Sequence, residues 1–469
     1  MSQPGISEYL AQRFMENLPY EPNDEQLQLL AELSHFCMMC GNDDLFLLNG
    51  YAGTGKTSMT GTLVKTLTEF NIKTVLLAPT GRAAKVFTEY SGHSAYTIHR
   101  KIYRQKSYSP DGGSGFLLSE NKHKNTIFIV DEASMLPNSS SEGAIFGTGR
   151  LLDDLIEYVY AGEGCKMIIL GDIAQLPPVG FDESPALSIE QLKCYGLNLH
   201  VFSLTKIARQ SEDSGILYNA TMLRDEMAKP VLEKPTLNTG SFEDFRNLPN
   251  EYMVETISDC YDRDGIENSI IVTRSNKRAT MFNMGIRNTI LYREEDLVPG
   301  DRLLVAKNNY FWSEPYEEID FIANGDMATV SRVISREERY GFKFAKVELY
   351  FADRDVELEA MINLTALFSD TPTLTRDQFN ELYMNIMPEL PHTRREQYKA
   401  LKSHPYFNAL QVKFAYAVTC HKAQGGQWKN VFVDMGFIPE EALTTRDFYR
   451  WLYTAVTRAR NQIYILGNI

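Results

Sequence analysis

The segment Gly50 to Thr57 is the strongest constraint on the fold, because it matches glycine, any four residues, then glycine, lysine and threonine. The apolar run Leu45 to Leu48 precedes it and is typical of a buried strand. After the Gly50 to Thr57 segment, apolar residues recur at helical spacing from Met59 to Phe70. A strand, a glycine loop and a helix in this order let backbone N–H groups and a helix N-terminus face a phosphate. The pattern therefore predicts an α/β fold with a nucleotide-phosphate site, and a glycine-rich turn without a ligand is the weaker alternative.

The chemistry of this loop assigns roles to its last residues. We expect the Lys56 ammonium to reach the β- and γ-phosphates of ATP and the Thr57 hydroxyl to ligate Mg²⁺. The residues expected to hold the nucleotide are Gly50, Ala52, Gly53, Thr54, Gly55, Lys56, Thr57 and Ser58.

Two further apolar runs end in polar residues. The run Thr126 to Val130 delivers Asp131 and Glu132, and the run Met167 to Leu170 is followed by Asp172 and Gln175. In isolation, two adjacent carboxylates usually belong to a solvated loop. Three strands that each end in polar residues instead indicate one catalytic edge of a parallel α/β sheet. There Asp131 would hold Mg²⁺ through water and Glu132 would deprotonate the attacking water, so the sequence predicts ATP hydrolysis.

Composition sets limits on other functions. The net charge of −14 disfavours simple coating of nucleic acid, so a DNA interface must rest on local basic residues. No apolar run is long enough to span a bilayer, and residues 1–22 lack a secretory pattern, so we expect a cytoplasmic protein. Among six cysteines, Cys37 and Cys40 have a metal-like gap, but no second Cys/His pair completes a zinc site. We therefore expect core thiols.

Beyond the phosphate loop, an ordered series of motifs resembles superfamily 1 DNA helicases of the RecD/Dda group over nearly the whole chain. The segments that carry the resemblance are Gln26, Ala78–Lys85, Thr97–His99, Val130–Met135, Gly171–Pro178, Leu204–Gln210, Val418–Gly425 and Val456–Arg460. One phosphate loop is common among ATPases, whereas this series in this order is far more specific.

The resemblance implies roles around the nucleotide. Gln26 would read adenine, Gln175 would sense the γ-phosphate, and Gly425 would lie in a motif that links DNA to the nucleotide cleft. Arg209 and Arg458 would act as arginine fingers supplied by a second motor domain. A surface ion pair is the ordinary alternative for an arginine.

One departure from the family pattern concerns the sugar. Gln427 stands where many relatives have a glutamate that contacts the ribose, so we expect Gln427 near the nucleotide, with an altered sugar contact.

The resemblance also implies a set of DNA-facing residues. They are Pro79, Thr80, Arg82, Thr97, His99, Thr273, Arg274, Asn276, Thr419, His421 and Lys422. Without the resemblance, His421 would be interpreted as a capping or core histidine. Contacts of this kind predict little sequence preference and strong salt dependence.

Residues 100–125 mix basic and aromatic side chains around a Gly/Ser-rich centre. We expect a hairpin that protrudes from the first motor domain, and in relatives such a hairpin acts as a wedge at a duplex fork. The alternative is an ordinary solvated loop. We have no account of the Ser/Gly-rich segment 138–149.

The expected architecture is α/β, with two RecA-like parallel-sheet P-loop motor domains, a β-hairpin insertion and an inserted SH3-like β-barrel. The first motor domain would span residues 1–200, and the second would span 201–292 and 405–469. The barrel and a polar helical segment would occupy 293–404.

The sequence thus predicts an ATP- and Mg²⁺-dependent DNA helicase, with 5′-to-3′ polarity taken from the resemblance alone. We expect a monomer that works on single-stranded DNA and duplex forks, with repair or replication proteins as partners and no membrane. One alternative is a DNA-stimulated ATPase that remodels nucleoprotein without unwinding. Another is a nucleotide switch without DNA, which leaves the DNA-facing motifs unexplained.

Overall fold

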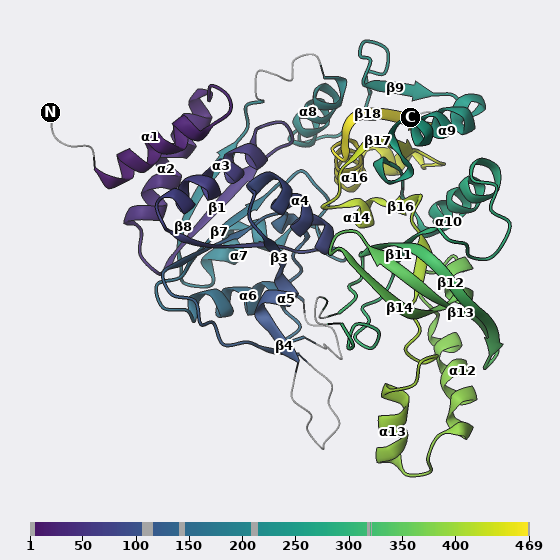
Figure 1. Cartoon of the computed structure of the whole chain (residues 1–469). Coiled ribbons are helices and arrows are strands. Elements are labelled where there is room, and N and C mark those ends of the chain that lie inside the picture. The colour runs from purple at the N-terminus through teal and green to yellow at the C-terminus, as the bar shows by residue number, and fades with distance from the viewer. Residues whose placement is uncertain are drawn as a thin grey trace. The chain divides into compact units, whose positions relative to one another are not determined.

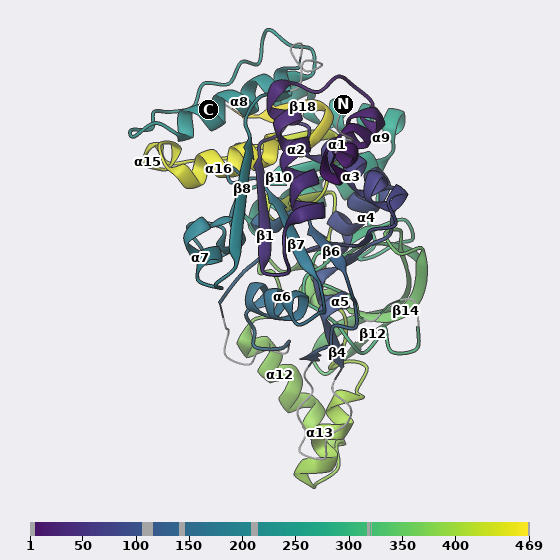
Figure 2. The same ribbon diagram turned by 90° about the vertical axis from the view of Figure 1, so that its left-hand side faces the viewer.

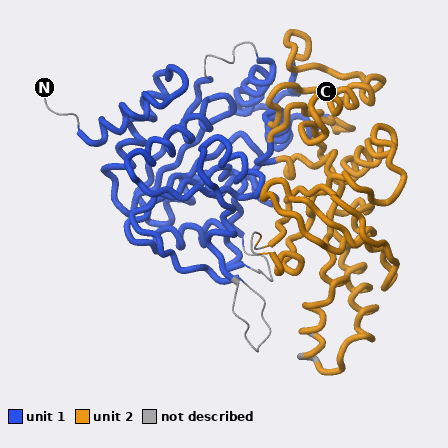
Figure 3. The backbone as a smooth tube through the Cα atoms, in the orientation of Figure 1, with its two compact units in different colours: residues 1–237, 424–426, 440–457 blue, residues 238–423, 427–439, 458–469 orange. Residues whose placement is uncertain are grey.

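The computed structural model describes residues 5–105, 116–139, 146–207, 214–316, 319 and 321–467, without the side chains of Gln105, Arg394, Arg395 and Tyr398 (Figure 1). The chain divides into two compact units (Figure 3). Unit 1 comprises residues 1–237, 424–426 and 440–457, and unit 2 comprises residues 238–423, 427–439 and 458–469. The domain boundaries drawn from the sequence stay a prediction.

Unit 1 is built on a six-stranded parallel sheet of order β3-β2-β6-β7-β1-β8. Figure 2 labels four neighbouring strands of this sheet, β6, β7, β1 and β8. Its strands are β1 (Asp44–Gly50), β2 (Lys73–Ala78), β3 (Ala95–Thr97), β6 (Thr126–Val130), β7 (Lys166–Gly171) and β8 (Asn198–Leu204). The central strands β1, β6 and β7 are buried along their whole length, which explains their continuous apolar sequences. The predicted parallel sheet is confirmed.

Helices cover both faces of this sheet. The helices described in unit 1 are α1 (Ile6–Asn17), α2 (Asp24–Met39), α3 (Lys56–Glu69), α4 (Gly81–Ser91), α5 (Ile98–Ile102), α6 (Leu151–Tyr160), α7 (Ile189–Lys193), α8 (Gly215–Met227), α15 (Glu440–Leu443) and α16 (Arg446–Val456). Alternate residues of β1 serve two separate cores, because successive strand side chains point to opposite faces. Leu45 and Leu47 pack with residues of α6, whereas Phe46 and Leu48 pack with residues of α2 and α3.

The two cysteines with a metal-like gap have different surroundings. Cys37 is a core thiol, as predicted, and is 8% exposed. Cys40 follows α2, is partly exposed, and lies beside His200, so the prediction of a core thiol is wrong for Cys40. All six cysteines are free thiols.

A two-stranded antiparallel ribbon confirms the predicted hairpin. It pairs β4 (Tyr103–Gln105) with β5 (Phe116–Leu118), and its tip, residues 106–115, lies outside the described residues. Phe146 stacks on Phe116 with ring centroids 4.7 Å apart. The end of the segment 138–149 therefore supports the base of the hairpin, while residues 140–145 lie outside the described part.

Unit 2 contains a second parallel sheet, of order β16-β10-β17-β18-β9. Its strands are β9 (Phe245–Leu248), β10 (Ser269–Thr273), β16 (Ala417–Thr419), β17 (Trp428–Asp434) and β18 (Ala459–Leu466). The helices next to it in sequence are α9 (Met253–Asp264), α10 (Asn276–Gly285) and α14 (Cys420–Ala423). The chain thus has two RecA-like parallel sheets, as predicted.

An antiparallel five-stranded sheet, of order β14-β13-β12-β11-β15, is also part of unit 2. Its strands are β11 (Arg302–Val305), β12 (Met327–Arg339), β13 (Phe342–Phe351), β14 (Val356–Asn363) and β15 (Val412–Phe414), and its attached helices are α11 (Leu364–Phe368), α12 (Arg376–Ile386) and α13 (Arg394–Lys402). The predicted β insertion is confirmed as a sheet, and its closure into an SH3-like barrel stays a prediction. Among the described helices, none combines the length and apolar character needed to cross a membrane.

Candidate active site

The phosphate loop joins β1 to α3 and depends on glycine at two positions. Gly53 and Gly55 have φ angles of +75° and +90°, in the left-handed region that L side chains rarely adopt. A Cβ on Gly55 would also lie 2.7 Å from Gln26 Nε2. The backbone therefore takes the curved form that turns N–H groups toward a phosphate.

Lys56 begins α3 and lies across the mouth of the loop. Its Nζ donates to the carbonyl oxygens of Gly50 and Tyr51, the latter at 3.1 Å, and lies 4.0 Å from Asp172 Oδ2. Thr57 and Ser58 follow in the first helical turn and are exposed. The ammonium and both hydroxyls thus stand at the helix N-terminus, where a phosphate is favoured.

The adjacent carboxylates leave the sheet at the end of β6. Asp131 Oδ2 accepts a hydrogen bond from Tyr90 Oη at 2.5 Å, and Asp131 Oδ1 accepts one from the Glu132 N–H at 2.8 Å. Burial and the neighbouring Asp131 carboxylate raise the pKa of Tyr90 well above its usual value, so this hydroxyl stays a donor. Glu132 has φ +53°, which is uncommon for a non-glycine residue and typical of functional sites.

Asp172 and Gln175 follow β7 and are both buried. Asp172 Oδ1 accepts from the Ala174 N–H at 3.0 Å, which fixes the turn. The amide oxygen of Gln175 has no hydrogen-bond partner within the described part of the chain. A buried acceptor without a partner is costly, and a bound ligand or water would satisfy it.

Tyr453 on α16 completes this edge, although the motifs did not identify it. Its hydroxyl donates to Asp172 Oδ2 at 2.7 Å and accepts from the N–H of Ala52 in the phosphate loop at 2.8 Å. The side chain is 1% exposed, and burial together with the Asp172 carboxylate raises the Tyr453 pKa well above its usual value. The sequence did not single it out, because the buried residues of α16 also include Tyr449 and Thr454.

These residues fit a magnesium–nucleotide ligand. The loop supplies N–H donors and the Lys56 charge, the Asp131 carboxylate and Thr57 hydroxyl are oxygen ligands of the kind Mg²⁺ prefers, and Gln175 offers an unsatisfied acceptor. Gln26, expected to read adenine, is 1% exposed and donates from Nε2 to the Thr54 carbonyl at 3.0 Å. It therefore packs against the loop, and its contact with adenine stays a prediction.

Gly425 and Gln427 belong to different units. In unit 1, a Cβ on Gly425, whose φ is +71°, would lie 2.9 Å from Ala83 Cβ and 3.2 Å from Thr80 Oγ1. In unit 2, Gln427 is exposed and its Oε1 accepts from Arg460 at 3.0 Å. Gly425 thus contacts the loop expected to bind DNA, and the ribose role of Gln427 stays a prediction.

The loop after β2 holds the first predicted DNA contacts. Thr80 caps α4, because its Oγ1 accepts from the Ala83 N–H at 3.2 Å. Pro79, Thr80 and Arg82 are all partly exposed. The cap therefore fixes a short turn that can be approached by a DNA backbone.

Thr97 and His99 lie at the end of β3. Thr97 caps α5 through the Arg100 N–H at 3.2 Å, and His99 packs edge-on against Phe146, with ring centroids 4.9 Å apart. Burial lowers the His99 pKa to about 4, so its ring is uncharged near neutral pH and does not attract phosphate as a cation.

The neighbouring Tyr96 was not identified from the sequence, although it is an exposed aromatic residue. Arg100 and Lys101 lie 5.9 Å and 5.4 Å from its ring centroid. An exposed aromatic ring beside two cations is typical of a platform for a nucleobase.

In unit 2, three of the predicted DNA contacts meet at one pocket. Asn276, Thr419 and Lys422 line it. Arg274 and His421 are exposed. Thr273 differs, because it is fully buried and its hydroxyl donates to the carbonyls of Ser275 and Val418 at 3.1 Å and 3.3 Å. It shapes the loop, and a direct DNA contact by its side chain stays a prediction.

Of the two predicted arginine fingers, the structure describes only Arg458. Arg209 lies outside the described residues. Arg458 follows α16 and is 3% exposed, and its carbonyl accepts from the Trp428 N–H at 3.0 Å. An exposed surface ion pair is therefore excluded for Arg458.

Two family models match the chain. An AAA domain model matches residues 22–237, and a UvrD-like helicase C-terminal domain model matches residues 414–466. The first region contains the phosphate loop with Asp131 and Gln175, and the second contains Lys422 and Arg458.

Three relatives are 24–25% identical to the chain over the aligned residues. The ATP-dependent RecD2 DNA helicase of Deinococcus radiodurans is 24% identical over 95% of this chain and 49% of its own length. The ATP-dependent DNA helicase dda of Enterobacteria phage T4 is 25% identical over 89% of this chain and 93% of its own length. An uncharacterised protein of Methanocaldococcus jannaschii is 25% identical, and the chain spans only 36% of it. The chain therefore covers half or less of two of these relatives.

Among solved structures, a Pif1 helicase from Bacteroides in complex with ADP-AlF3 and single-stranded DNA is 15% identical to the chain. The match covers 96% of this chain and 93% of the Pif1 chain, with a TM-score of 0.47. Taken with the nucleotide edge and the order of the motifs, the two models and the RecD2 and Dda relatives show that the chain belongs to the superfamily 1 DNA helicases of the RecD/Dda group.

Proposed function

We propose that this chain is an ATP-driven DNA helicase that moves 5′ to 3′ along single-stranded DNA and separates duplexes. One observation carries the proposal: in unit 1, the loops that follow β1, β2, β6 and β7 leave the same edge of one parallel sheet. Three of them hold the nucleotide residues, and the loop after β2 holds Pro79 to Arg82. Carboxyl-end loops of parallel strands form the usual ligand edge of such a sheet.

The residues at this edge divide the work of hydrolysis. Thr57 and Asp131 would hold Mg²⁺, which supplies charge neutralisation for the phosphates. Glu132 accepts the proton of the attacking water, and Gln175 orients that water through its buried amide oxygen. Lys56 neutralises the phosphate oxygens, and Arg209 and Arg458 add positive charge in the transition state.

Short contacts within unit 1 provide a route from nucleotide to DNA. Gln424 Nε2 donates to the Leu176 carbonyl at 2.7 Å, and the Leu176 N–H donates to Thr454 Oγ1 at 2.8 Å. Gly425, which follows Gln424 in the sequence, lies against Thr80. A shift of the turn that holds Gln175 is thereby passed through two residues to the DNA-facing loop, as translocation requires.

We propose roles in unwinding for the β4-β5 ribbon and for the five-stranded sheet of unit 2. The β4-β5 ribbon would act as a wedge at the fork, and the five-stranded sheet of unit 2 would close as an SH3-like barrel beside the DNA. We further propose single-stranded DNA and forks as substrates, with repair or replication proteins as partners.

Stimulation of ATP hydrolysis by single-stranded DNA distinguishes the proposed motor from a nucleotide switch. We expect DNA to raise the rate of ATP hydrolysis at least about tenfold, with strong salt dependence. The measurement is steady-state phosphate release with and without an unstructured oligonucleotide. An ATPase rate that DNA leaves unchanged would support the switch.

Tyr453→Phe is expected to lower ATP turnover by about 10-fold or more, because it leaves the Ala52 N–H and Asp172 Oδ2 unsatisfied at a cost of about 1–3 kcal/mol. The matched control is Tyr449→Phe on the same helix, whose hydroxyl donates instead to the Glu233 carbonyl at 2.8 Å. Turnover and ATP affinity are measured in parallel. Equal turnover in the two variants would contradict the role of Tyr453.

DNA affinity is expected to fall by about tenfold between pH 7 and pH 9, because burial lowers the Lys422 pKa to about 8. Below pH 8 the ammonium is charged and can pair with phosphate, and above it the unbound protein loses this charge. Lys422→Arg keeps its charge throughout and should flatten the profile. The nearby Lys413, whose pKa burial also lowers to about 8, is present in both proteins and cancels in the comparison. Parallel pH profiles for the two proteins would refute the assignment.

A further inference from the structure

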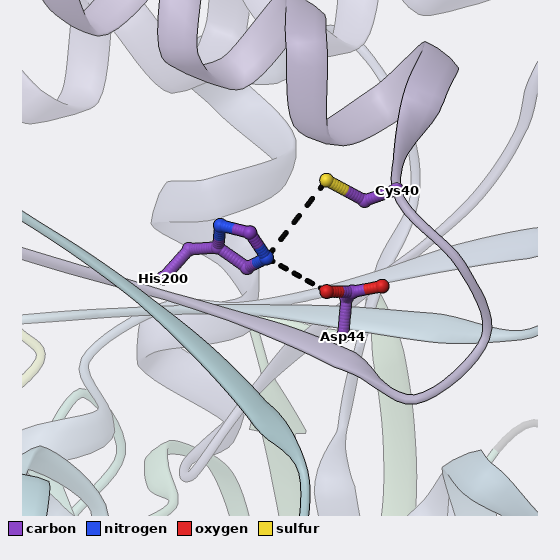
Figure 4. Close-up of side chains that lie close together, drawn as sticks. All are labelled: Cys40, Asp44 and His200. Atoms are coloured by element: carbon purple, nitrogen blue, oxygen red, sulfur yellow. Dashed lines mark hydrogen bonds and ion pairs between the residues drawn. The ribbon is translucent and has the colours of Figure 1, made fainter.

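Three side chains that can bind metals meet at the end of the unit 1 sheet opposite the phosphate loop. Cys40 follows the last turn of α2, Asp44 begins β1, and His200 lies in the edge strand β8. Their ligand atoms all lie within 4.8 Å of one another. Figure 4 shows the three side chains pointing toward a common space.

Both contacts in this cluster use the same ring nitrogen. His200 Nε2 lies 2.7 Å from Asp44 Oδ1 and 3.8 Å from Cys40 Sγ. In a catalytic cysteine–histidine–aspartate arrangement, the acid and the thiol engage opposite nitrogens of the imidazole. Here they converge on one nitrogen, so the geometry does not fit an activated nucleophile.

An ordinary ion pair explains only part of the arrangement. Protonated His200 would pair with Asp44, but its single Nε2–H cannot serve both the carboxylate and the sulfur well. A thiol sulfur, an imidazole nitrogen and a carboxylate oxygen within 4.8 Å of one another are a set of ligands of the kind that binds a metal ion.

We propose that Cys40, Asp44 and His200 bind one divalent transition-metal ion of the zinc class, with water as a further ligand. Sulfur, imidazole nitrogen and carboxylate oxygen are the ligands of this class, whereas Mg²⁺ prefers oxygen alone. Typical bonds of about 2.0–2.3 Å to each atom place ligand atoms no more than about 4.6 Å apart, close to the 4.8 Å within which all three ligand atoms lie. The observed 3.8 Å between sulfur and nitrogen suits such bonds, and the 2.7 Å between nitrogen and oxygen needs only a small opening.

The ammonium of Lys166, which lies near the cluster, is bound by backbone carbonyl oxygens. Lys166 Nζ donates to the carbonyl oxygens of Phe36, Cys37 and Cys40 at 2.6, 3.0 and 3.1 Å. These bonds satisfy the last turn of α2 and bind the ammonium to backbone oxygens rather than to the three side-chain ligands. The Cys40 side chain is left to face His200 (Figure 4).

The ion would fasten β8 to the turn between α2 and β1, which lies 156 residues earlier in the sequence. It joins the end of α2 and the start of β1 to β8, an edge strand that pairs on one side only, with β1. Asp44 and Gly50 are the two ends of β1, so the site lies about 20 Å from the phosphate loop. Its role is therefore structural, and ATP hydrolysis should not depend on it.

The test is titration of the intact, chelator-treated chain with Co²⁺, followed by displacement with Zn²⁺. We expect one Co²⁺ per chain, with the near-ultraviolet charge-transfer absorption of a cobalt–thiolate bond. Cys40→Ser and His200→Ala should each weaken binding by about 100-fold or more. The control is Cys194→Ser, which removes an exposed thiol on unit 1 and should leave the spectrum unchanged.

Two results would overturn the metal site. The first is a wild-type chain that shows no cobalt–thiolate absorption, which decides the matter whether or not the variants fold. The second is a Cys40→Ser chain that keeps the absorption. DNA-stimulated ATP hydrolysis, measured on the same samples, should match the wild type in Cys40→Ser. A failed metal site is thereby distinguished from a failed motor.

Discussion

Lys56→Ala is expected to abolish ATP hydrolysis while the protein stays folded. Lys56 carries the only ammonium at the mouth of the described phosphate loop, and its Nζ already lies against the Gly50 and Tyr51 carbonyls. Removing it leaves the charge that develops on the phosphate oxygens without a partner, which is the largest single contribution such a site makes. Phosphate release in the presence of saturating DNA measures the loss.

A lysine nine residues further along the same helix provides the control. Lys65 is exposed on α3, and Lys65→Ala removes an equal charge from the same element without touching the loop. It should retain nearly full turnover. If Lys56→Ala and Lys65→Ala hydrolyse ATP at similar rates, the assignment of the phosphate site is wrong.

Arg458→Ala is expected to lose about 10³-fold or more in turnover and to keep nucleotide binding, since an arginine finger acts mainly in the transition state. The side chain is 3% exposed, so it is not an ordinary surface cation. Single-turnover hydrolysis and binding of a fluorescent nucleotide separate the two effects. Thermal unfolding of the same variant shows how far the loss of a buried side chain affects stability.

Arg460→Ala is the matched comparison for the finger. Arg460 stands two residues away, is exposed, and donates to Gln427 Oε1. Its loss should change turnover by only a few fold. Near-normal turnover in Arg458→Ala, or an equal loss in Arg460→Ala, would remove Arg458 from the reaction.

The sequence predicted the shared sheet edge of Lys56, Asp131 and Gln175, because local patterns encode it. Continuous apolar runs such as Thr126 to Val130 are long enough for buried parallel strands, and the polar residue that follows each run must lie at the carboxyl end. Once the strands are parallel, Lys56, Asp131 and Gln175 come from the same edge. Neither the order of the strands nor any distance is needed for that conclusion.

Contacts between remote segments were not predictable in the same way. Tyr453 meets Ala52 across 401 residues, and His200 meets Cys40 across 160 residues. No periodicity relates such positions, because they become neighbours only when the sheet is assembled. The expectation that Cys40 is a core thiol failed for this reason.

Motif resemblance also could not predict how individual side chains pack. Thr273 and His99 occupy positions that face DNA by resemblance, yet Thr273 bonds to backbone carbonyls and His99 packs against Phe146. Burial of a particular side chain depends on what other segments cover it. That information is present in the packing and not in the motif.

The central claim, ATP-driven strand separation with 5′-to-3′ polarity, is tested most directly on partial duplexes with a single tail. One substrate carries only a 5′ single-stranded tail and the other only a 3′ tail of the same length and sequence composition. We predict ATP-dependent unwinding of the 5′-tailed duplex, little unwinding of the 3′-tailed duplex, and none of either by Lys56→Ala. Unwinding of the 3′-tailed duplex alone would contradict the polarity. Failure to unwind either substrate, while single-stranded DNA still stimulates ATP hydrolysis, would contradict the helicase and favour a motor that remodels nucleoprotein.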